Sequence, residues 1–274
     1  HCNDLPVLKI AKLYKDENPR VKLVYDSHEI FSEMTGLNYF ERMRWSIHEE
    51  SLASSVDAFI TVNPYISDIL NKRNPDLPRG IVVRNAFHKI DKLSNFQTRK
   101  KAIDNDNLIV KRILALKGND IEGKRILLFQ GGIGYGRGLD KLVKSAEFLK
   151  EEWAVVFIGW GSLQSELELL AASAETLDRK VFFLPKVHRD ELGLWTRCAD
   201  IGIIPYENVS MNNWYCSPNK LWEYPSCSVP ILVSPNPYLR EIVEENNIGW
   251  VLPEWFTGED IAFIVIKLGE DEID

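Results

Sequence analysis

The sequence predicts an α/β fold in which parallel sheets are covered by helices on both faces. Short apolar runs rich in β-branched residues alternate along the chain with segments of helical periodicity. Several of these runs lack polar alternation, as strands buried on both faces do. A repeated strand–helix–strand order implies right-handed crossovers between parallel strands. The 274 residues, 45% hydrophobic and 27% charged, fit a soluble globular protein with room for two domains.

The first part of the chain carries predicted helices and strands in strict alternation. The strands are the β-branched runs VKLVYD, DAFITV and GIVVRN, and amphipathic helices precede each of them. In order, the elements are helix 5–16, strand 21–26, helix 39–54, strand 57–62, helix 64–73 and strand 80–85. The stretch from Asn85 to Lys124 then breaks this rhythm, because it is polar and dense in Lys, Arg and Asp. We interpret it, with its helical piece at 106–117, as a crossing between a domain at 1–105 and one at 106–274.

The second domain continues the alternation and adds glycine turns. Its predicted strands are 125–131, 153–159, 180–185, 200–206 and 229–234, and its predicted helices are 137–151, 161–177, 189–198 and 236–246. The turns FQGGIGYGRG and FIGWGS follow the first two of these strands. Glycines let the backbone approach a ligand, and ligands of such sheets bind at the carboxyl ends of the strands. The sequence therefore predicts a phosphate-bearing small molecule at this edge.

One candidate anion site lies in the turn FQGGIGYGRG. It follows a predicted strand and opens a helix, so backbone amides near Gly131 and Gly132 could face an anion. Arg137 adds positive charge at the mouth of the helix, where it can pair with a phosphate. The spacing is neither that of a P-loop nor that of the dinucleotide fingerprint. A tight turn that binds nothing is the alternative.

A second candidate anion site is the stretch CSPNKLWEY, where a short helix is expected after a Ser-Pro-Asn-Lys loop. Ser217 suits the N-cap, and Pro218 suits the first turn. Amides at this N-terminus would then be available to a diphosphate, namely those of Asn219, Lys220 and Leu221. Glu223 could accept hydrogen bonds from a diol such as a ribose. A capped helix with a solvated glutamate is the alternative.

The strand-end segment VYDSHE offers a candidate catalytic histidine, His28. A histidine there can act as a base or donate to a substrate hydroxyl, and a hydrogen-bonded loop residue is the alternative. The acidic pair Asp104 and Asp106 lies in the charged crossing rather than at a strand end, so we predict no metal site.

Charge and hydropathy exclude some classes of partner. The net charge of −7 argues against general nucleic-acid binding. No apolar run is long enough to span a bilayer, and no signal peptide precedes His1. The four cysteines form no CxxC pair and none lies beside a His at zinc-ligand spacing, so we expect reduced thiols and a cytoplasmic location. Because the chain does not begin with Met, we expect it to be a piece of a longer protein.

The chain also carries, in this order, the blocks HCND, LVYDSHE, VDAFITVNPYISDIL, IVVRNAF, ILLFQGGIGYGRGLDKLVKSAEFL, VVFIGWGSLQSEL, VFFLPKVHRDELGLWTRCADIGIIPY and SPNKLWEYPSCSVPILVS. Their order and spacing resemble those of family-4 (group 1) retaining glycosyltransferases of the GT-B architecture. The resemblance implies two Rossmann-like parallel-sheet domains facing a cleft, an acceptor-side domain followed by a donor-side domain. It also implies that the N-terminal domain is incomplete here, since the first strands of the family should precede His1.

The resemblance further implies a function, the transfer of a sugar from a nucleotide diphosphate-sugar to a glycan or lipid-linked acceptor with retention at the anomeric carbon. By position, Glu223 would hold the ribose, Arg137 and the amides after Pro218 the diphosphate, and the loop ending at Val187 the base. His28 would lie near the reacting sugar. The family generally needs no metal and no cofactor besides this co-substrate. Lipid acceptors are common in it, so peripheral contact with the inner face of the membrane stays open.

Two positions depart from the family. Many members carry glutamate where this chain has Tyr215, and arginine where it has Gly132, so Lys220 would have to assist Arg137 at the diphosphate. These departures favour an alternative, a truncated or degenerate module that binds nucleotide-sugars without transfer. A third alternative is a sugar-nucleotide epimerase of the same architecture.

Overall fold

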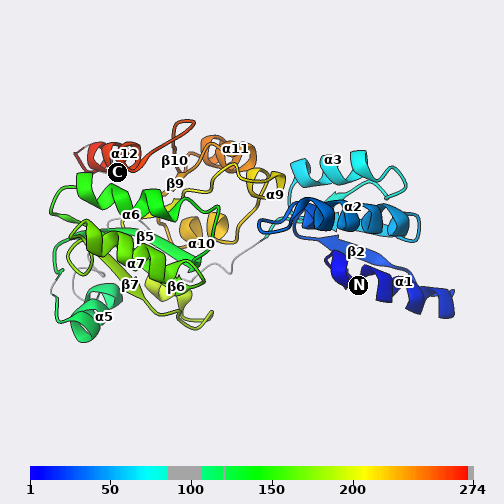
Figure 1. The fold of residues 1–274 in the computed structure, drawn as a ribbon, viewed down its shortest axis with the longest axis horizontal. Helices are drawn as coiled ribbons and strands as arrows, with labels where there is room; N and C mark the ends of the chain where they lie inside the picture. Colours follow the sequence, from blue (N-terminus) through cyan, green and yellow to red (C-terminus); the bar gives the residue numbers. More distant parts are fainter. Residues whose placement is uncertain (86–106, 120, 271–274) are drawn as a thin grey trace. The chain divides into compact units, whose positions relative to one another are not determined.

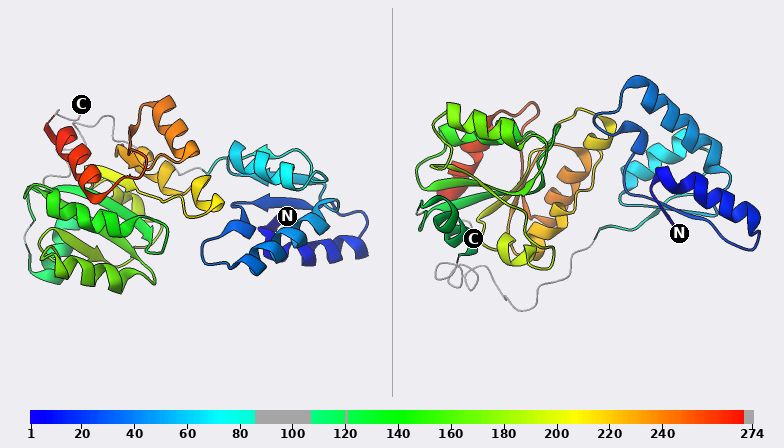
Figure 2. Two further views of the ribbon diagram at one scale, coloured as in Figure 1. Left: turned by 45° about the horizontal axis from the view of Figure 1, so that its top comes forward. Right: turned by 60° about the horizontal axis from the view of Figure 1, so that its bottom comes forward.

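The structure, a computed structural model, describes residues 1–85, 107–119 and 121–270. They form two compact units, each built on one parallel sheet (Figures 1 and 2). Unit 1 comprises His1–Asn85, Asn208–Ser217 and Asn236–Tyr238, and unit 2 comprises the described residues of Ala86–Glu207, Pro218–Pro235 and Leu239–Asp274. The predicted domain boundary at 105/106 lies outside the described residues.

The sheet of unit 1 has four parallel strands in the order β1-β2-β3-β4. The strands are β1 (Cys2–Asn3), β2 (Val24–Ser27), β3 (Ala58–Thr61) and β4 (Ile81–Val82). The helical elements are η1 (Leu5–Val7), α1 (Leu8–Glu17), η2 (Phe31–Glu33), α2 (Tyr39–Ala53) and α3 (Pro64–Arg73). In the core, the ring of Tyr25 on β2 stacks on that of Phe59 on β3 with centroids 5.6 Å apart, and both side chains are fully buried.

Local sequence explains where the helices of unit 1 begin. Asn38 and Glu41 form a reciprocal capping box at the start of α2. At the start of α3, the side chain of Asn63 accepts from the amide of Ile66, and Pro64 takes the first helical position. The predicted bounds 39–54 and 64–73 therefore agree closely with the observed helices.

Residues 208–217 belong to unit 1, although the prediction assigned them to the second domain with the rest of 106–274. They include the short helix α9 (Met211–Trp214). The amide of Ile30 donates to Asn212 Oδ1 at 2.9 Å, and Asn63 Nδ2 donates to the carbonyl of Tyr215 at 2.8 Å. The ring of Tyr215 also stacks on that of Tyr65, with centroids 5.6 Å apart. These contacts, made by side chains far apart in the sequence, explain the grouping.

The sheet of unit 2 has six parallel strands in the order β10-β9-β8-β5-β6-β7. The strands are β5 (Arg125–Gly132), β6 (Trp153–Trp160), β7 (Val181–Leu184), β8 (Ile201–Ile204), β9 (Ile231–Val233) and β10 (Gly249–Val251). The helices of this part of the chain are α5 (Leu108–Lys117), α6 (Leu139–Phe148), α7 (Gln164–Ser173), α8 (Leu192–Thr196), α10 (Lys220–Ser226), α11 (Pro237–Asn246) and α12 (Gly258–Glu270). Helix α6 lies beside α7 and α12 (Figure 1). The order reverses between β5 and β8, the kind of switch point at which α/β sheets bind ligands.

Each predicted strand is confirmed as a strand within a residue or a few of its expected bounds. The sequence analysis did not assign β1, β10, α9 or α12. The strands β1 and β10 are two and three residues long and lack a continuous β-branched run, so they had no signal of their own.

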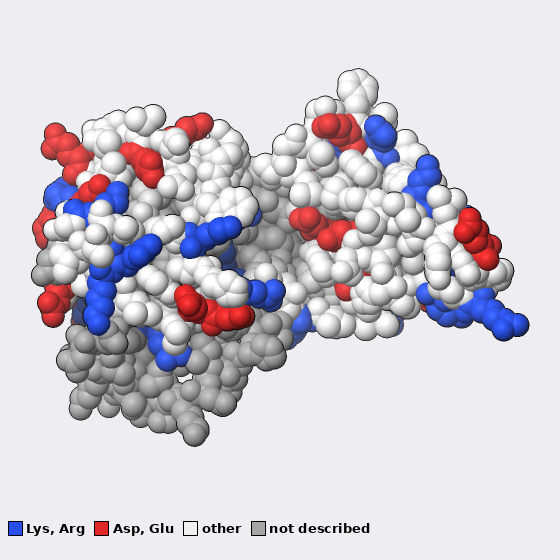
Figure 3. All heavy atoms as spheres, turned by 90° about the horizontal axis from the view of Figure 1, so that it is seen from below, with Lys and Arg blue, Asp and Glu red and all other residues white. Residues whose placement is uncertain are grey.

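None of the helices formed by the described residues is long and apolar enough to cross a membrane. Figure 3 shows Lys and Arg side chains interspersed with Asp and Glu side chains over one face of the described residues. Uncharged residues cover most of that face, and charged side chains of both signs are mixed among them.

Candidate functional site

In the turn after β5, the guanidinium of Arg137 folds back onto the backbone of the same turn. Arg137 Nη1 donates to the carbonyl of Gly132 at 2.6 Å. A Cβ atom added at Gly132 would lie 3.0 Å from that nitrogen, so the guanidinium occupies space that a side chain would need. Gly131 has a φ of 115°, a conformation that favours glycine. All three residues lie together at or just beyond the carboxyl end of β5.

Lys220, the first residue of α10, reaches the same turn. Its Nζ lies 3.4 Å from the position that a Cβ at Gly131 would take. The ammonium donates to Tyr206 Oη at 3.2 Å and lies 3.9 Å from the centroid of the Phe129 ring. The side chain is buried at 5% exposure, and aromatic faces stabilise a cation in such a place.

Tyr206, two residues beyond β8, joins the two cations. The guanidinium carbon of Arg137 lies 5.5 Å from the centroid of its ring, and Lys220 Nζ lies 5.2 Å from it. Two positive charges beside a glycine turn make this corner of unit 2 a candidate site for an anion such as a diphosphate.

Glu223 is held by a side chain of β5. Gln130 Nε2 donates to Glu223 Oε2 at 2.7 Å. Gln130 is 1% exposed, whereas Glu223 is half-buried. The carboxylate therefore has a fixed partner on its protein side and keeps solvent access, as a ligand-binding acid requires.

The start of α10 differs from the prediction. The helix begins at Lys220, and Asn219 at the N-cap position has helical backbone angles without a side-chain cap. Ser217 is not the cap, since its buried Oγ finds no hydrogen-bond partner among the described residues. The amide of Leu221 donates to the carbonyl of Pro218 at 3.0 Å, so a local turn uses this predicted phosphate donor. Asn219 already has helical backbone angles, so the helical turn begins before Lys220. For this reason Ser217 does not cap the helix, and the amide of Leu221 bonds to the carbonyl of Pro218.

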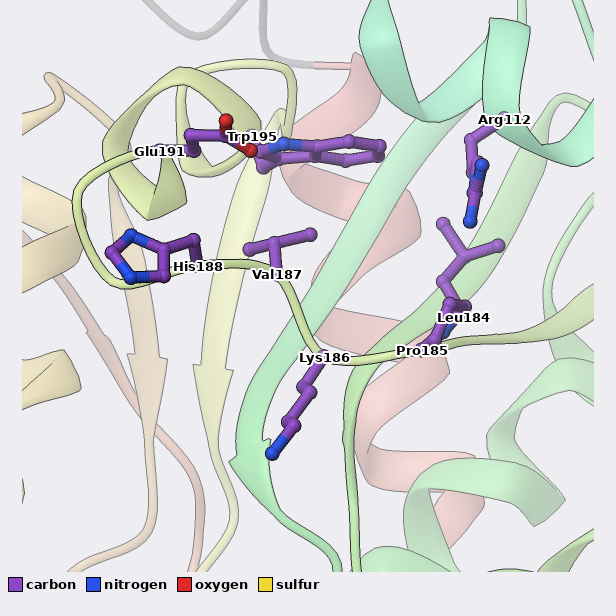
Figure 4. A pocket seen from close by; sticks show the side chains of 8 residues that line it. All are labelled: Arg112, Leu184, Pro185, Lys186, Val187, His188, Glu191 and Trp195. Carbon is purple, nitrogen blue, oxygen red and sulfur yellow. The ribbon is translucent and has the colours of Figure 1, made fainter.

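The residues after β7 line a pocket of about 290 Å³ (Figure 4). Its lining comes from β7 and the following loop, from α5 and from α8, and consists of Arg112, Leu184, Pro185, Lys186, Val187, His188, Glu191 and Trp195. Figure 4 shows Lys186 extending away from Trp195. Its Nζ lies 5.4 Å from the ring centroid of Trp160, which ends β6. Val187 therefore lies in a hollow with an aromatic ring, cations and a carboxylate around it.

His28 lies in unit 1, just beyond the end of β2. Its Nε2 is 3.3 Å from Asp26 Oδ1, and its Nδ1 is 3.7 Å from Asp4 Oδ2. The backbone amide of His28 also donates to Asp4 Oδ1 at 3.0 Å. The ring is 48% exposed, so it has oriented partners and can still be reached by a substrate.

Unit 2 thus brings together Gly131, Gly132, Arg137, Lys220 and Glu223, and holds Val187 in the pocket after β7. Ser217 and His28 belong to unit 1. Sequence reasoning missed Tyr206 and Gln130. A glutamine at the end of the apolar run RILLF was a signal for the second, because a buried amide needs partners.

Within residues 1–85, 107–119 and 121–270, no group of three or more His, Cys, Asp or Glu side chains is arranged to hold a metal ion. The acidic pair Asp104 and Asp106 lies outside the described residues.

Comparison with known proteins gives a family match. A family model described as "Glycosyl transferases group 1" matches residues 112–274, more than half of the chain.

Two curated relatives match parts of the chain. The amylovoran biosynthesis glycosyltransferase AmsK of Erwinia amylovora is 25% identical over 143 residues, which are 50% of this chain and 34% of that protein. The D-inositol 3-phosphate glycosyltransferase of Xylanimonas cellulosilytica is 32% identical over 122 residues, which are 43% of this chain and 28% of that protein. The chain therefore spans about a third of the length of these relatives.

The fold is also found in solved structures. HepE of Anabaena, crystallised in complex with UDP and glucose, superposes with a TM-score of 0.72 and 14% sequence identity, over 98% of this chain and 67% of that one. A likeness at this identity concerns the fold alone. With the two parallel-sheet units, it confirms the predicted GT-B fold class.

Proposed function

Because the chain belongs to the family of group 1 glycosyl transferases, we propose that it binds a nucleotide diphosphate-sugar through unit 2 and serves transfer of that sugar to an acceptor. The acceptor would be a glycan or a lipid-linked glycan, and the anomeric configuration would be retained. Relatives named for amylovoran biosynthesis and for inositol phosphate glycosylation support sugar transfer as the class of reaction.

One observation carries the proposal, the gathering of Arg137 and Lys220 on Tyr206 beside the turn Gly131–Gly132. A diphosphate has two negatively charged groups, and two cations at one glycine turn match that charge. As the bond between sugar and phosphate breaks, negative charge builds up on the diphosphate. Preorganised cations stabilise this charge where it develops, which lowers the barrier of the reaction.

The rest of the nucleotide has candidate partners in the same unit. Glu223 would accept hydrogen bonds from the ribose hydroxyls, because a carboxylate is the strongest neutral-pH acceptor among side chains. Val187 and the hollow around it would receive the base, with the ring of Trp195 as an apolar wall. The UDP bound to HepE supports a nucleoside diphosphate as the ligand class.

His28 would act on the acceptor side. Asp4 and Asp26 orient its ring, and its half-exposure leaves one edge for a sugar hydroxyl. We assign it a role near the reacting sugar rather than in binding the nucleotide.

A second candidate function is nucleotide-sugar binding without transfer. One observation favours it: Tyr215 stands where many family members carry glutamate, and here it stacks on Tyr65 within unit 1. A tyrosine ring in this half-buried stack does not replace a carboxylate that holds sugar hydroxyls.

Two measurements separate these functions. A thermal-shift panel with UDP-, GDP-, ADP- and CMP-sugars should raise the melting temperature for at least one donor, because a ligand of the native state stabilises it. Radiolabelled donor and a lipid-linked glycan acceptor, supplied to the full-length protein, should then give a labelled product with retained configuration. Binding without turnover would favour the second function, and no binding of any donor would refute both.

A further inference from the structure

We infer that Gln130 is a positioning residue for Glu223, which rests on the proposed role of this glutamate as the acceptor for the ribose. The side chain of Gln130 is 1% exposed and emerges from β5, a strand that is otherwise apolar in its buried part. Burying an amide there costs free energy unless its polar atoms are paired. Gln130 Nε2 donates to Glu223 Oε2 at 2.7 Å, so the amide both satisfies its own need for a partner and holds the carboxylate in place.

The backbone of Gln130 is tied to the same helix as Glu223. Its amide donates to Tyr224 Oη at 3.1 Å, and this hydroxyl donates to the carbonyl of Leu128 at 2.9 Å. Burial raises the pKa of the Tyr224 hydroxyl well above its ordinary value, so the hydroxyl keeps its proton. The two bonds fix β5 against α10 one residue away from Glu223.

The carboxylate of Glu223 and the hydroxyl of Thr196 together fix the orientation of the Gln130 amide. Thr196 Oγ1 lies 2.8 Å from Gln130 Oε1 and 2.8 Å from the carbonyl of Leu192, yet a hydroxyl has one proton to donate. A carboxylate oxygen accepts hydrogen bonds, and Gln130 presents its N–H to Glu223 Oε2. Gln130 Oε1 then faces Thr196 and receives the hydroxyl proton. The order of donation is therefore Thr196 to Gln130 to Glu223.

This arrangement prepares Glu223 for a diol. The bond from Gln130 uses one of about four lone-pair sites of the carboxylate, so others stay available to two adjacent hydroxyls. It also holds the side chain in one rotamer before binding, which reduces the entropy that a ligand must overcome. Gln130 itself need not touch the ligand.

The test compares nucleotides with and without the ribose hydroxyls. UDP, GDP and ADP, each with its 2′,3′-dideoxy counterpart, are titrated calorimetrically into the wild-type chain and into Gln130→Leu and Thr196→Val. For the base that binds, the wild type should prefer the ribonucleotide by about 10- to 100-fold. In Gln130→Leu that preference should fall to within about threefold of unity, while affinity for inorganic pyrophosphate is kept. Thr196→Val, which lacks the hydroxyl at nearly the same volume, should lose part of the preference.

Two further variants sharpen the result. Gln164 donates to Glu168 at 2.8 Å on α7, so Gln164→Leu removes the same kind of pair elsewhere in unit 2 and should leave the preference unchanged. Gln130→Glu sets a second carboxylate beside Glu223 that can donate only when protonated. The preference should therefore be lost at pH 8 and return as the pH is lowered toward 5.

The outcomes separate this role from the proposed function. An unchanged ribonucleotide preference in Gln130→Leu overturns the positioning role and leaves the proposed function standing. Loss of pyrophosphate binding in a folded Gln130→Leu also overturns it, since the residue would then support the whole site. A wild-type chain that binds none of the three nucleotides refutes the proposed function and this role together.

Discussion

Arg137 and Lys220 reach the same aromatic ring from different elements of unit 2. The guanidinium carbon of Arg137 lies 5.5 Å and the ammonium of Lys220 5.2 Å from the centroid of Tyr206. One cation precedes α6, the other begins α10, and the turn after β5 lies against both. Strands and helices distant in the sequence thus cooperate to concentrate positive charge at one corner.

The first prediction concerns this charge. Arg137→Ala should weaken binding of a nucleoside diphosphate by about 1.5–3 kcal/mol, because it removes charge-assisted hydrogen bonds to the phosphates. Binding of the matching nucleoside, which has no phosphate, should not change. Titration calorimetry with UDP and uridine measures both. The matched control is Arg179→Ala, an arginine of unit 2 that pairs with Glu151 on the surface. Equal affinities of wild type and Arg137→Ala for UDP would contradict the binding of a diphosphate at this corner.

Removing the carboxylate of Glu223 should weaken nucleotide binding by about 1.5–3 kcal/mol, or about 10- to 100-fold. The physical reason is the loss of an ionised acceptor for the ribose hydroxyls. We would measure Glu223→Ala by calorimetry beside Glu168→Ala, which removes a carboxylate that also accepts from a glutamine. A variant with wild-type affinity would show that Glu223 does not hold the ribose.

His28→Ala in the full-length protein should reduce sugar transfer more than donor binding. The imidazole lies in unit 1, whereas the candidate donor residues lie in unit 2, so the substitution leaves the nucleotide partners intact. Turnover with labelled donor gives the first quantity, and the thermal shift with the same donor gives the second. Parallel losses in both would count against a role at the reacting sugar.

Gly159→Ala should destabilise unit 2 by about 1–3 kcal/mol or more, the usual cost of overpacking. Its Cβ would overlap the backbone carbonyl of Gly131 on the neighbouring strand, and strand backbone cannot move aside cheaply. Gly134→Ala is the matched control, because a Cβ there meets nothing within 4 Å. Urea unfolding of the two variants should separate them clearly. A stable Gly159→Ala would mean that β5 and β6 can spread apart at this edge.

Glu49 should make the stability of unit 1 depend on pH. Its side chain is 1% exposed, and burial raises the pKa of its carboxyl above the ordinary value, although hydrogen bonds from Tyr25 and Asn74 act in the opposite direction. The folded state therefore holds this proton more tightly than the unfolded state. The stabilisation is fully present below the ordinary pKa and is lost as the pH rises through the raised one.

Each unit by which this pKa is raised corresponds to about 1.4 kcal/mol. Glu49→Gln should therefore flatten the fall in the free energy of unfolding between acidic and neutral pH. Any constant cost of the substitution shifts the curve without changing its slope. Urea unfolding at a series of pH values measures that slope, with the exposed Glu50→Gln as control. Identical slopes for wild type and Glu49→Gln would show that the buried carboxyl does not govern the titration.

Much of the fold followed from sequence because its strands carry their own signal. RILLFQG and WAVVFIG are short, rich in buried apolar residues and followed by glycine turns, a pattern typical of central parallel strands. The capping residues Asn38 and Asn63 likewise fix helix starts locally. Strand β10, by contrast, exists only because it pairs with β9, a contact that no short window of sequence contains.

Several residues of the candidate site could be predicted from the sequence, but the side-chain contacts between them could not. The motifs indicated Arg137 and Glu223, because a charged residue next to a glycine turn and a carboxylate within a short helix can be recognised in a short stretch of sequence. Tyr206 and Gln130 act through neighbours that are 69 and 93 positions away in the sequence, Arg137 and Glu223 respectively. The cap assigned to Ser217 was wrong because the backbone angles of Asn219, which depend on the surrounding packing, decide where the turn begins.

The chain passes from one unit to the other at Ser217–Pro218, directly before α10. A recombinant fragment cut at the predicted boundary, 106–274, would therefore contain α9 but lack Ile30 and Asn63. These two residues donate hydrogen bonds to Asn212 and to the carbonyl of Tyr215. Such a piece would expose the ring of Tyr215 and leave the strand-to-helix segment before Lys220 untethered at one end. Studies of donor binding are better designed around both units expressed as a single polypeptide than around an excised half.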